Sequence, residues 1–321
     1  MRRLLAGLAA GTALLTTAAC GSSGGSSSTS SSSGGTTTVK VGIIPIVDVA
    51  PLYLGQKEGF YSKRGLKLSM TLAQGGAAVV PGVTSGQFQF GFSNMTSLMI
   101  AQSNNVPVRA IANGVASTGV AGKDFGGLVV KKGRDITSAK QLEGKKVAVN
   151  TLKNINETAV RESVRKAGGD PGKVSFVELA FDQMPAALDK GQIDAAMAVE
   201  PALATMKLQG ATEIASPLVD VAKNLTVAMY FTSTSYAQKN PDVVKKFQEA
   251  TAESLAYADA HPDEVRQIVT TYTKTPADVL AAVTLPKWPA DPNRSSIDTL
   301  EKLSEQDGLF KTAPDLDKLL P

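Results

Sequence analysis

The chain has 321 residues, a formal net charge of +4, one histidine and one cysteine. A single cysteine excludes an intramolecular disulfide framework, and one histidine with one cysteine cannot supply the usual zinc ligands. No run of five or more basic residues occurs and no phosphate-loop or dinucleotide glycine motif is present, so we expect no nucleic acid, no metal and no cofactor.

The first 19 residues are typical of an export signal. Arg2 and Arg3 precede an apolar run over 4–19 that is too short, and too rich in Gly, Ala and Thr, for a membrane span. The run ends in Thr-Ala-Ala-Cys-Gly, which resembles the bacterial lipobox, although Thr17 stands where that motif usually has leucine. The resemblance implies that Cys20 is lipidated. The alternative is a conventional signal peptide that contains a cysteine by chance.

Residues 21–38 are all Gly, Ser or Thr. Such a segment cannot bury enough apolar surface to fold, so we predict a flexible tether over 20–38. Removal of residues 1–19 would take away Arg2 and Arg3 and lower the formal charge from +4 to +2. No later stretch approaches the roughly 18 consecutive apolar residues of a membrane span. The sequence therefore predicts a globular body anchored to the outer face of the cell membrane.

From residue 39 onward the hydrophobic pattern alternates between strands and helices. Expected strands and the helices between them fall, in chain order, at 39–44 (strand), 51–59 (helix), 66–70 (strand), 77–85 (helix), 88–93 (strand), 95–103 (helix) and 106–112 (strand). Strands separated by helices of this length predict parallel sheets with helices on both faces.

A second lobe is predicted to start near Gly127. Its first elements are a strand at 128–130, a helical turn at 136–142, a strand at 145–150 and a helix opened by the capping-box pair Asn154 and Glu157. After a strand at 226–231 the chain becomes mostly helical. Three residue–proline pairs, at 240–241, 261–262 and 275–276, indicate helix starts, and we expect these helices to return to the first lobe.

Two segments, 85–94 and 190–200, share one local pattern. In each, a glycine ends a helix, a glutamine precedes an apolar strand, and a polar residue ends that strand. Their positions in separate halves predict two lobes built on similar plans.

Four stretches together resemble the nitrate/sulfonate/taurine-type (SsuA/THI5-like, NMT1-like) substrate-binding proteins of ABC transporters. They lie in order within residues 39–201, at 47–66, 75–91, 136–149 and 186–201. The resemblance implies an α/β, two-lobed periplasmic-binding-protein-like fold of type II, with mixed sheets flanked by helices. Two hinge crossings would fall near 125–130 and 226–232. We expect lobe 1 at 39–127, lobe 2 at 128–228 and a return to lobe 1 with C-terminal helices at 229–321.

Ligands of parallel α/β sheets bind beyond the carboxyl ends of strands, where helix N-termini present unpaired N–H groups. The corresponding loops supply twelve candidate ligand-binding residues: Pro45, Asp48, Gly76, Ala77, Ser93, Asn94, Asn113, Asn150, Thr151, Asn154, Glu200 and Tyr230. Each polar candidate could instead be a cap or turn residue, and Tyr230 could be buried at the hinge. Small residues at 76 and 77 would let backbone approach a ligand.

Two acids decide the expected ligand class. Asp48 and Glu200 place carboxylates on both sides of the proposed cleft, whereas Lys153 is the only cation in these loops. Unpaired acids repel simple anions and favour an amine, a ring N–H or a hydroxyl. We therefore expect a small organic solute: a zwitterion, a neutral heterocycle, or an organic acid held by helix ends.

An enzyme is the main rival. His261 lies beside Pro262 at an expected helix start, where it reads as a cap, so a catalytic triad has no base. We expect no catalytic residue. The partners implied by the resemblance are an ABC permease with its ATPase, and the chain is expected to be a monomer. Two further alternatives are a ligand-sensing lipoprotein that signals to a receptor and a pyrimidine-precursor enzyme of the same fold.

Overall fold

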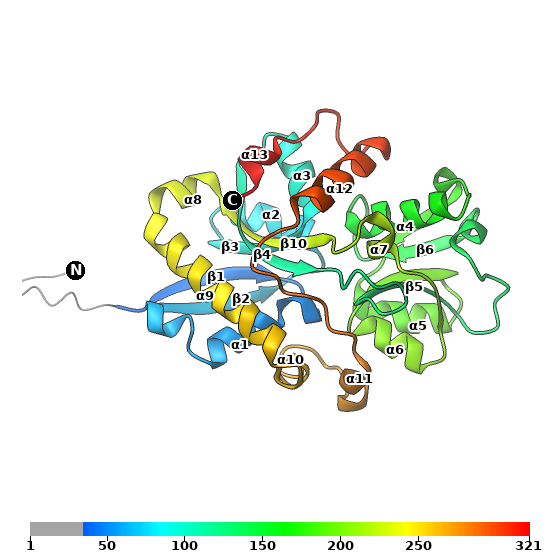
Figure 1. Cartoon of the computed structure of the whole chain (residues 1–321), viewed down its shortest axis with the longest axis horizontal. Helices are drawn as coiled ribbons and strands as arrows, with labels where there is room; N and C mark the ends of the chain where they lie inside the picture. Colours follow the sequence, from blue (N-terminus) through cyan, green and yellow to red (C-terminus); the bar gives the residue numbers. More distant parts are fainter. Residues whose placement is uncertain (1–34) are drawn as a thin grey trace, which may run out of the picture. The chain divides into compact units, whose positions relative to one another are not determined.

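Two five-stranded sheets, each flanked by helices, make up residues 35–321, which are the residues that the computed structural model describes (Figure 1). The predicted export signal, Cys20 and the tether up to residue 34 lie outside the described residues. The first strand begins at Thr37, so the last two residues of the predicted tether, Thr37 and Thr38, belong to the sheet instead.

The first sheet has the order β2-β1-β3-β10-β4 and the second has the order β7-β6-β8-β5-β9. The strands, in chain order, are β1 (Thr37–Ile43), β2 (Leu66–Leu72), β3 (Phe90–Asn94), β4 (Val108–Ala116), β5 (Gly126–Val130), β6 (Lys146–Val149), β7 (Ser175–Glu178), β8 (Ala195–Val199), β9 (Thr212–Ala215) and β10 (Thr226–Ser233).

Both sheets are mixed. In the first, β1 pairs in parallel with β2 and β3, while β10 is antiparallel to β3 and β4. In the second, β6 pairs in parallel with β7 and β8, while β5 is antiparallel to β8 and β9. The α/β class with mixed sheets is confirmed, and the parallel-only pattern expected from helix spacing is wrong. The spacing of strands along the sequence does not show in which direction each strand runs in its sheet, so it did not reveal that β5 and β10 are antiparallel to their neighbours.

The shared pattern of the two halves is confirmed in the sheets. β3 and β8 occupy the same position, each between a parallel and an antiparallel neighbour. Gly86 and Gly191, which follow the helices before these strands, have φ values of 80° and 67°. Only glycine adopts this left-handed backbone without strain, so it ends both helices.

The helices cover the sheets, and the three predicted at 51–59, 77–85 and 95–103 begin and end within two residues of those bounds. They are α1 (Ala50–Lys57), α2 (Gly76–Thr84), α3 (Met95–Ser103), α4 (Ile155–Lys166), α5 (Met184–Asp189), α6 (Ala202–Leu208), α7 (Pro217–Val221), α8 (Thr234–Lys239), α9 (Pro241–Ala260), α10 (Pro262–Val269), α11 (Ala277–Ala282), α12 (Arg294–Gln306) and α13 (Leu316–Leu319), with short 3-10 turns η1 (Val47–Val49), η2 (Ser62–Arg64), η3 (Ala139–Leu142), η4 (Pro171–Lys173) and η5 (Phe181–Gln183). No helix among residues 35–321 combines the length and the apolar character needed to cross a membrane.

Local helix signals held in part. The Asn154 side chain caps α4 by accepting from Asn156 N and Glu157 N, but Glu157 returns its bond to Lys153 N instead of Asn154 N, so the capping box is incomplete. His261 makes no cap bond at the start of α10. His261 does occupy the N-cap position of α10, as predicted, but its Nδ1 contacts the carbonyl oxygen of Tyr257 in α9 at 2.7 Å and does not cap the helix.

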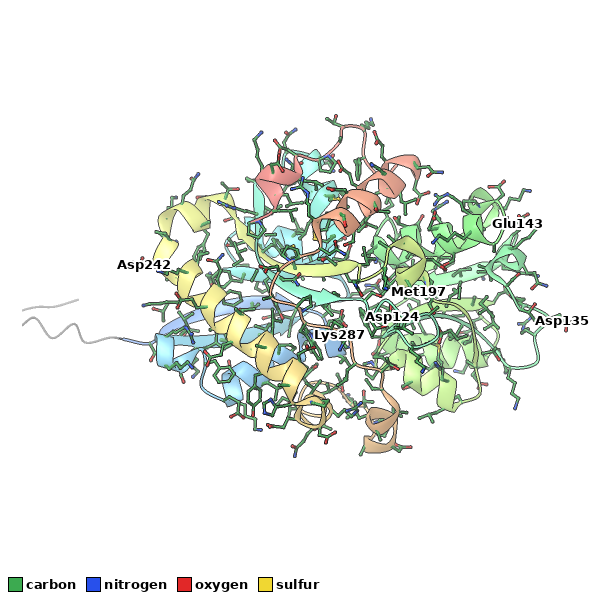
Figure 2. All side chains as sticks on the ribbon, in the orientation of Figure 1. Asp124, Asp135, Glu143, Met197, Asp242 and Lys287 are labelled. Carbon is green, nitrogen blue, oxygen red and sulfur yellow. The ribbon has the colours of Figure 1, made fainter. Side chains whose placement is uncertain are left out.

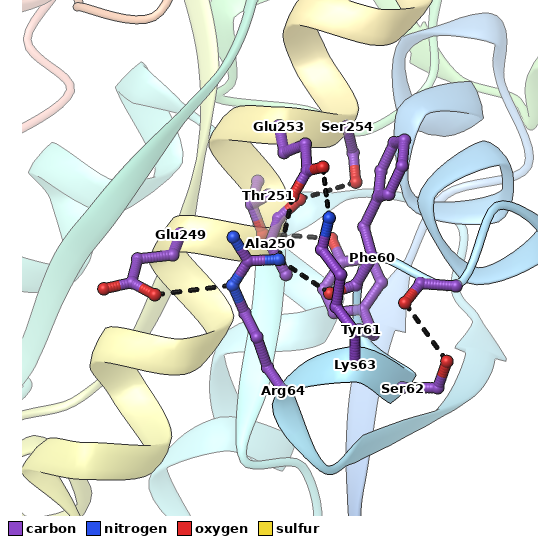
Figure 3. Close-up of polar contacts among 11 residues, drawn as sticks. Phe60, Tyr61, Ser62, Lys63, Arg64, Glu249, Ala250, Thr251, Glu253 and Ser254 are labelled. Atoms are coloured by element: carbon purple, nitrogen blue, oxygen red, sulfur yellow. Dashed lines mark hydrogen bonds and ion pairs between the residues drawn. The ribbon is translucent and has the colours of Figure 1, made fainter.

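Figure 3 shows how α9 is held against η2 and the residues directly before it. The Tyr61 hydroxyl hydrogen-bonds Thr251 Oγ1 at 3.0 Å, and Arg64 Nη1 donates to Glu253 Oε2 at 2.8 Å. α10 also packs on α1, as predicted for the returning helices. The third predicted start differs, because Pro276 is itself the N-cap of α11. α11 packs on α6, which covers the second sheet, so this part of the predicted return is wrong.

The chain passes between the sheets at 117–125 and 216–225, where the predicted crossings near 125–130 and 226–232 begin, while β5 and β10 themselves each lie wholly in one sheet. Ser117 N donates to Leu225 O at 2.9 Å and joins the two connections. The buried Asp124 carboxylate accepts from Ser117 Oγ and from Thr118 N. A later segment runs alongside, since Lys287 pairs with Ala116; Figure 2 labels Asp124 and Lys287 in this region.

Candidate functional site

Loops that follow strands of the two sheets touch directly. Gln74, after β2, donates from Nε2 to Asn150 O, after β6, at 2.9 Å. Val47 N, after β1, donates to Glu200 O, after β8, at 3.2 Å. A Cβ on Gly75 would lie 2.8 Å from Thr151 Cγ2. The carboxyl ends of strands from both sheets therefore meet at one place.

A groove of about 890 Å³ lies beside these contacts. Its walls come from both halves and include Pro45, Gln74, Phe181, Pro201, Tyr272 and Lys274. The volume is within the usual range for small-molecule sites. Of the twelve candidate residues, only Pro45 lines this groove. The sequence missed Tyr272 and Lys274 because they belong to the connection between α10 and α11, which follows no strand.

Most other candidates are buried at the strand ends, and several have structural duties. Asn94 caps α3 by accepting from Ser97 N at 2.9 Å. A Cβ on Gly76 would lie 2.2 Å from Ser93 Oγ, so this glycine permits close packing of α2 on β3. Ala77 is exposed.

A network of amides occupies the loop after β6. Asn150 Oδ1 accepts from Asn154 Nδ2 at 2.7 Å and from Asn156 Nδ2 at 2.8 Å. Thr151 Oγ1 accepts a second bond from Asn154 Nδ2 at 2.9 Å. Asn156 was not predicted, because its position inside a helix carries no loop signal. Because these polar groups satisfy one another's hydrogen bonds, the network rigidifies the loop after β6, which forms the second sheet's side of the contact.

Glu200 is a structural acid. It is 2% exposed, and burial raises its pKa to about 7. Its Oε2 accepts from Ala204 N at 2.8 Å and its Oε1 accepts from Thr284 N at 3.1 Å. Both oxygens are therefore engaged by backbone N–H groups, which oppose the effect of burial on the pKa.

Asp48 is equally buried but differently bonded. It is 2% exposed, and burial raises its pKa to about 7. Within the described part of the chain its Oδ1 has no hydrogen-bond partner, and the same holds for Asn113 Oδ1 and the Tyr230 hydroxyl. Buried polar atoms are nearly always hydrogen-bonded, so these three are exceptions. The hydroxyls of Thr96 in α3 and Thr158 in α4 also lack a partner within residues 35–321.

Residues 35–321 contain no group of three or more His, Cys, Asp or Glu side chains placed to hold a metal ion. His261 stacks on Tyr257 with ring centroids 3.8 Å apart, at the junction of α9 and α10. It is held there by packing.

Two sheets of equal plan whose strand ends meet across a groove define the two-lobed periplasmic binding proteins. Residues 46–265 match the family described as NMT1/THI5 like, and the chain belongs to this family.

Named relatives include both binding proteins and enzymes. The chain is 25% identical over 226 residues to the taurine-binding periplasmic protein of Escherichia coli, covering 70% of this chain and 68% of that protein. It is 24% identical over 226 residues to the 4-amino-5-hydroxymethyl-2-methylpyrimidine phosphate synthase of Aspergillus parasiticus, covering 66% of this chain and 64% of the synthase. The matches thus span about two thirds of each relative.

Solved structures share the fold. The ligand-binding component of an ABC-type import system from Staphylococcus aureus, solved with zinc bound, superposes with a TM-score of 0.77 at 18% identity, covering 89% of this chain and 96% of that one. The alkanesulfonate-binding protein SsuA from Xanthomonas axonopodis pv. citri, bound to MOPS, gives a TM-score of 0.74 at 14% identity, covering 88% and 98%. Both are binding proteins.

Proposed function

We propose that this chain is the extracytoplasmic solute-binding component of an ABC importer. It captures a small organic solute between its two lobes, closes around it by rotation about the 117–125 and 216–225 connections, and delivers it to a permease coupled to an ATPase. The solute is sulfonate- or taurine-like, an organic acid, or pyrimidine-like. Cys20 carries a lipid that holds the chain, as a monomer, on the outer face of the cell membrane.

One observation carries this proposal: strand ends of two similar sheets meet through few hydrogen bonds next to a groove lined by both. Gln74 and Asn150 exchange two hydrogen bonds and Val47 donates one to Glu200; each bond contributes about 1 kcal/mol, so breaking these contacts costs little free energy. Hinge closure of this kind is common in binding proteins. Family membership and the named binding proteins give the proposal its class.

The enzyme alternative has the matches to fungal synthases in its favour. Against it, His261 bonds the Tyr257 carbonyl and stacks on the Tyr257 ring, and it does not line the groove. A binding protein needs no acid–base group, and the described site residues provide hydrogen-bonding groups without a nucleophile–base pair.

The test is a thermal-shift screen of the full chain against sulfonates, carboxylates, amino acids and pyrimidines, followed by recovery of the bound compound. A ligand that binds only the folded state stabilises it by about 2.7 kcal/mol at a hundredfold excess over Kd. We expect at least one compound to raise the melting temperature and to be recovered unchanged. Recovery of a chemically altered compound would instead establish an enzyme, and no stabilisation across the panel would refute the proposal.

A further inference from the structure

Three buried polar side chains of the first sheet and its loops have an atom without a hydrogen-bond partner in the described chain, and most of these atoms are acceptors. Asp48 Oδ1 and Asn113 Oδ1 can only accept, and each lacks a partner among residues 35–321. The Tyr230 hydroxyl, fully buried against Phe92 at a centroid distance of 5.2 Å, also lacks one and can accept or donate. A group that satisfies all three must bring at least two donors.

The two acceptors are held in place by one neighbouring segment. Trp288 Nε1 donates to the Asp48 carbonyl oxygen at 3.0 Å. Asn113 Nδ2 donates to Pro289 O at 2.7 Å, which consumes the donor end of this amide and leaves Oδ1 as the unpaired end. The pairing of Lys287 with Ala116 fixes the segment against β4. The acceptors are thus positioned by the fold.

No protein cation compensates the Asp48 carboxylate. In the described chain, no Lys or Arg forms an ion pair with it, although seventeen ion pairs occur elsewhere. A buried charge is normally paired with a group of opposite charge or with hydrogen-bond donors. Since the described chain supplies no cation to Asp48, a ligand could supply the donor. Burial is the main cause that raises the pKa of Tyr230 and of Tyr272, and the Asp48 charge adds a smaller contribution in the same direction to each.

None of the three residues lines the groove itself, but the loop that carries Asp48 adjoins it. Asp48 follows Val47, whose N–H bonds the Glu200 carbonyl of the other half. The hydroxyl of Tyr272, which lines the groove, donates to Ile46 O at 3.1 Å, and Ile46 lies in the same loop as Asp48. Opening of the lobes would break the hydrogen bond between Val47 and Glu200, and it would therefore release the loop that carries Asp48.

We propose that Asp48, Asn113 and Tyr230 form a subsite for a protonated amino group, so that the solute of this chain is a small amine or amino acid analogue. The inference rests on the proposed function and narrows its substrate class. An ammonium group offers three donors and a positive charge, which match two fixed acceptors, one hydroxyl and an uncompensated carboxylate. Glu200 takes no part, because both of its oxygens are already bonded.

The experiment compares matched probes that differ only in the amino group. Titration calorimetry of the full chain uses taurine against ethanesulfonate and β-alanine against propionate. We expect the amine of at least one pair to bind about 10- to 100-fold more tightly than its partner, as is typical for charge-assisted hydrogen bonds. Equal affinities within a pair that binds would overturn the inference and leave the proposed function intact. If no probe of either pair binds but another class stabilises the chain in the screen, the amine subsite is also wrong.

Variants separate recognition from folding. Asp48→Asn keeps the side-chain shape and removes the charge, and Tyr230→Phe removes only a hydroxyl that has no partner within the described fold. We expect each to reduce the preference for the amine at least tenfold. Tyr61→Phe is the matched control, because Tyr61 is also a buried tyrosine but its hydroxyl bonds Thr251 Oγ1 at 3.0 Å. It should keep the preference. Full preference in both Asp48→Asn and Tyr230→Phe would overturn the subsite.

Discussion

A buried acid follows one strand of each sheet, and the two acids differ in how their carboxylate oxygens are hydrogen-bonded. Asp48 follows β1 and Glu200 follows β8; both are 2% exposed, and burial raises the pKa of each to about 7. Glu200 is bonded on both oxygens by backbone N–H groups, whereas Asp48 Oδ1 has no partner in the described chain. Burial and a raised pKa therefore do not distinguish a structural acid from a ligand-binding one; the hydrogen bonds do.

The largest expected effect is the pH dependence of Asp48. Because its pKa in the folded chain lies above its ordinary value of 3.8, the folded chain holds a proton that the unfolded chain releases between about pH 4 and pH 7. Wild-type stability should therefore fall as pH rises through this window. In Asp48→Asn that contribution is absent, so the ligand-free variant should equal wild type near pH 4 and exceed it by about 2–4 kcal/mol at pH 8.

Urea unfolding at a series of pH values measures this difference. Asp124 and Tyr272, which lie close enough to interact with the Asp48 region, are present in both proteins, so their contributions largely cancel. A difference that does not change between pH 4 and pH 8 would show that Asp48 ionises normally in the folded chain.

The next effect tests the structural role of Glu200. Glu200→Ala leaves the backbone N–H groups of Ala204 and Thr284 without acceptors. Because an unsatisfied buried donor costs about 1–3 kcal/mol, we expect a loss of about 3 kcal/mol in the free energy of unfolding at pH 6. Denaturant titration checks this value. Stability within about 0.5 kcal/mol of wild type, in the range of ordinary surface substitutions, would place Glu200 in the same category as Asp48 and remove the contrast.

The smallest effect repeats the comparison with neutral groups. The Tyr61 hydroxyl bonds Thr251 at 3.0 Å (Figure 3). The Tyr230 hydroxyl has no partner within residues 35–321, and both tyrosines are buried. Tyr61→Phe should cost about 1 kcal/mol, and Tyr230→Phe should be neutral or slightly stabilising, because no bond is lost. The same denaturation experiment measures both. Equal losses would mean that the Tyr230 hydroxyl is satisfied in the free protein.

Much of the fold could be predicted from the sequence because it is written in short-range patterns. α3 has the predicted bounds, 95–103, and the two Gly–Gln segments do occupy equivalent positions in the two sheets. Helix ends need glycine, and buried strands need continuous apolar residues, so these signals are local. The direction of β10 in the first sheet and the contact of α11 with α6 depend on the path of the chain between the two sheets. No local sequence pattern predicts that path.

Candidate site residues show the same division. Sequence alone determined that acids, amides and small residues follow the strands, and hence which loops form the edges of the sheets. Only the tertiary structure decided their roles. It gave Asn94 to a helix cap, bonded both oxygens of Glu200, and brought Tyr272 and Lys274 to the groove from a connection between helices. The physical reason is that a polar group's function depends on which partners remain unsatisfied after folding, and those partners come from segments distant in the chain.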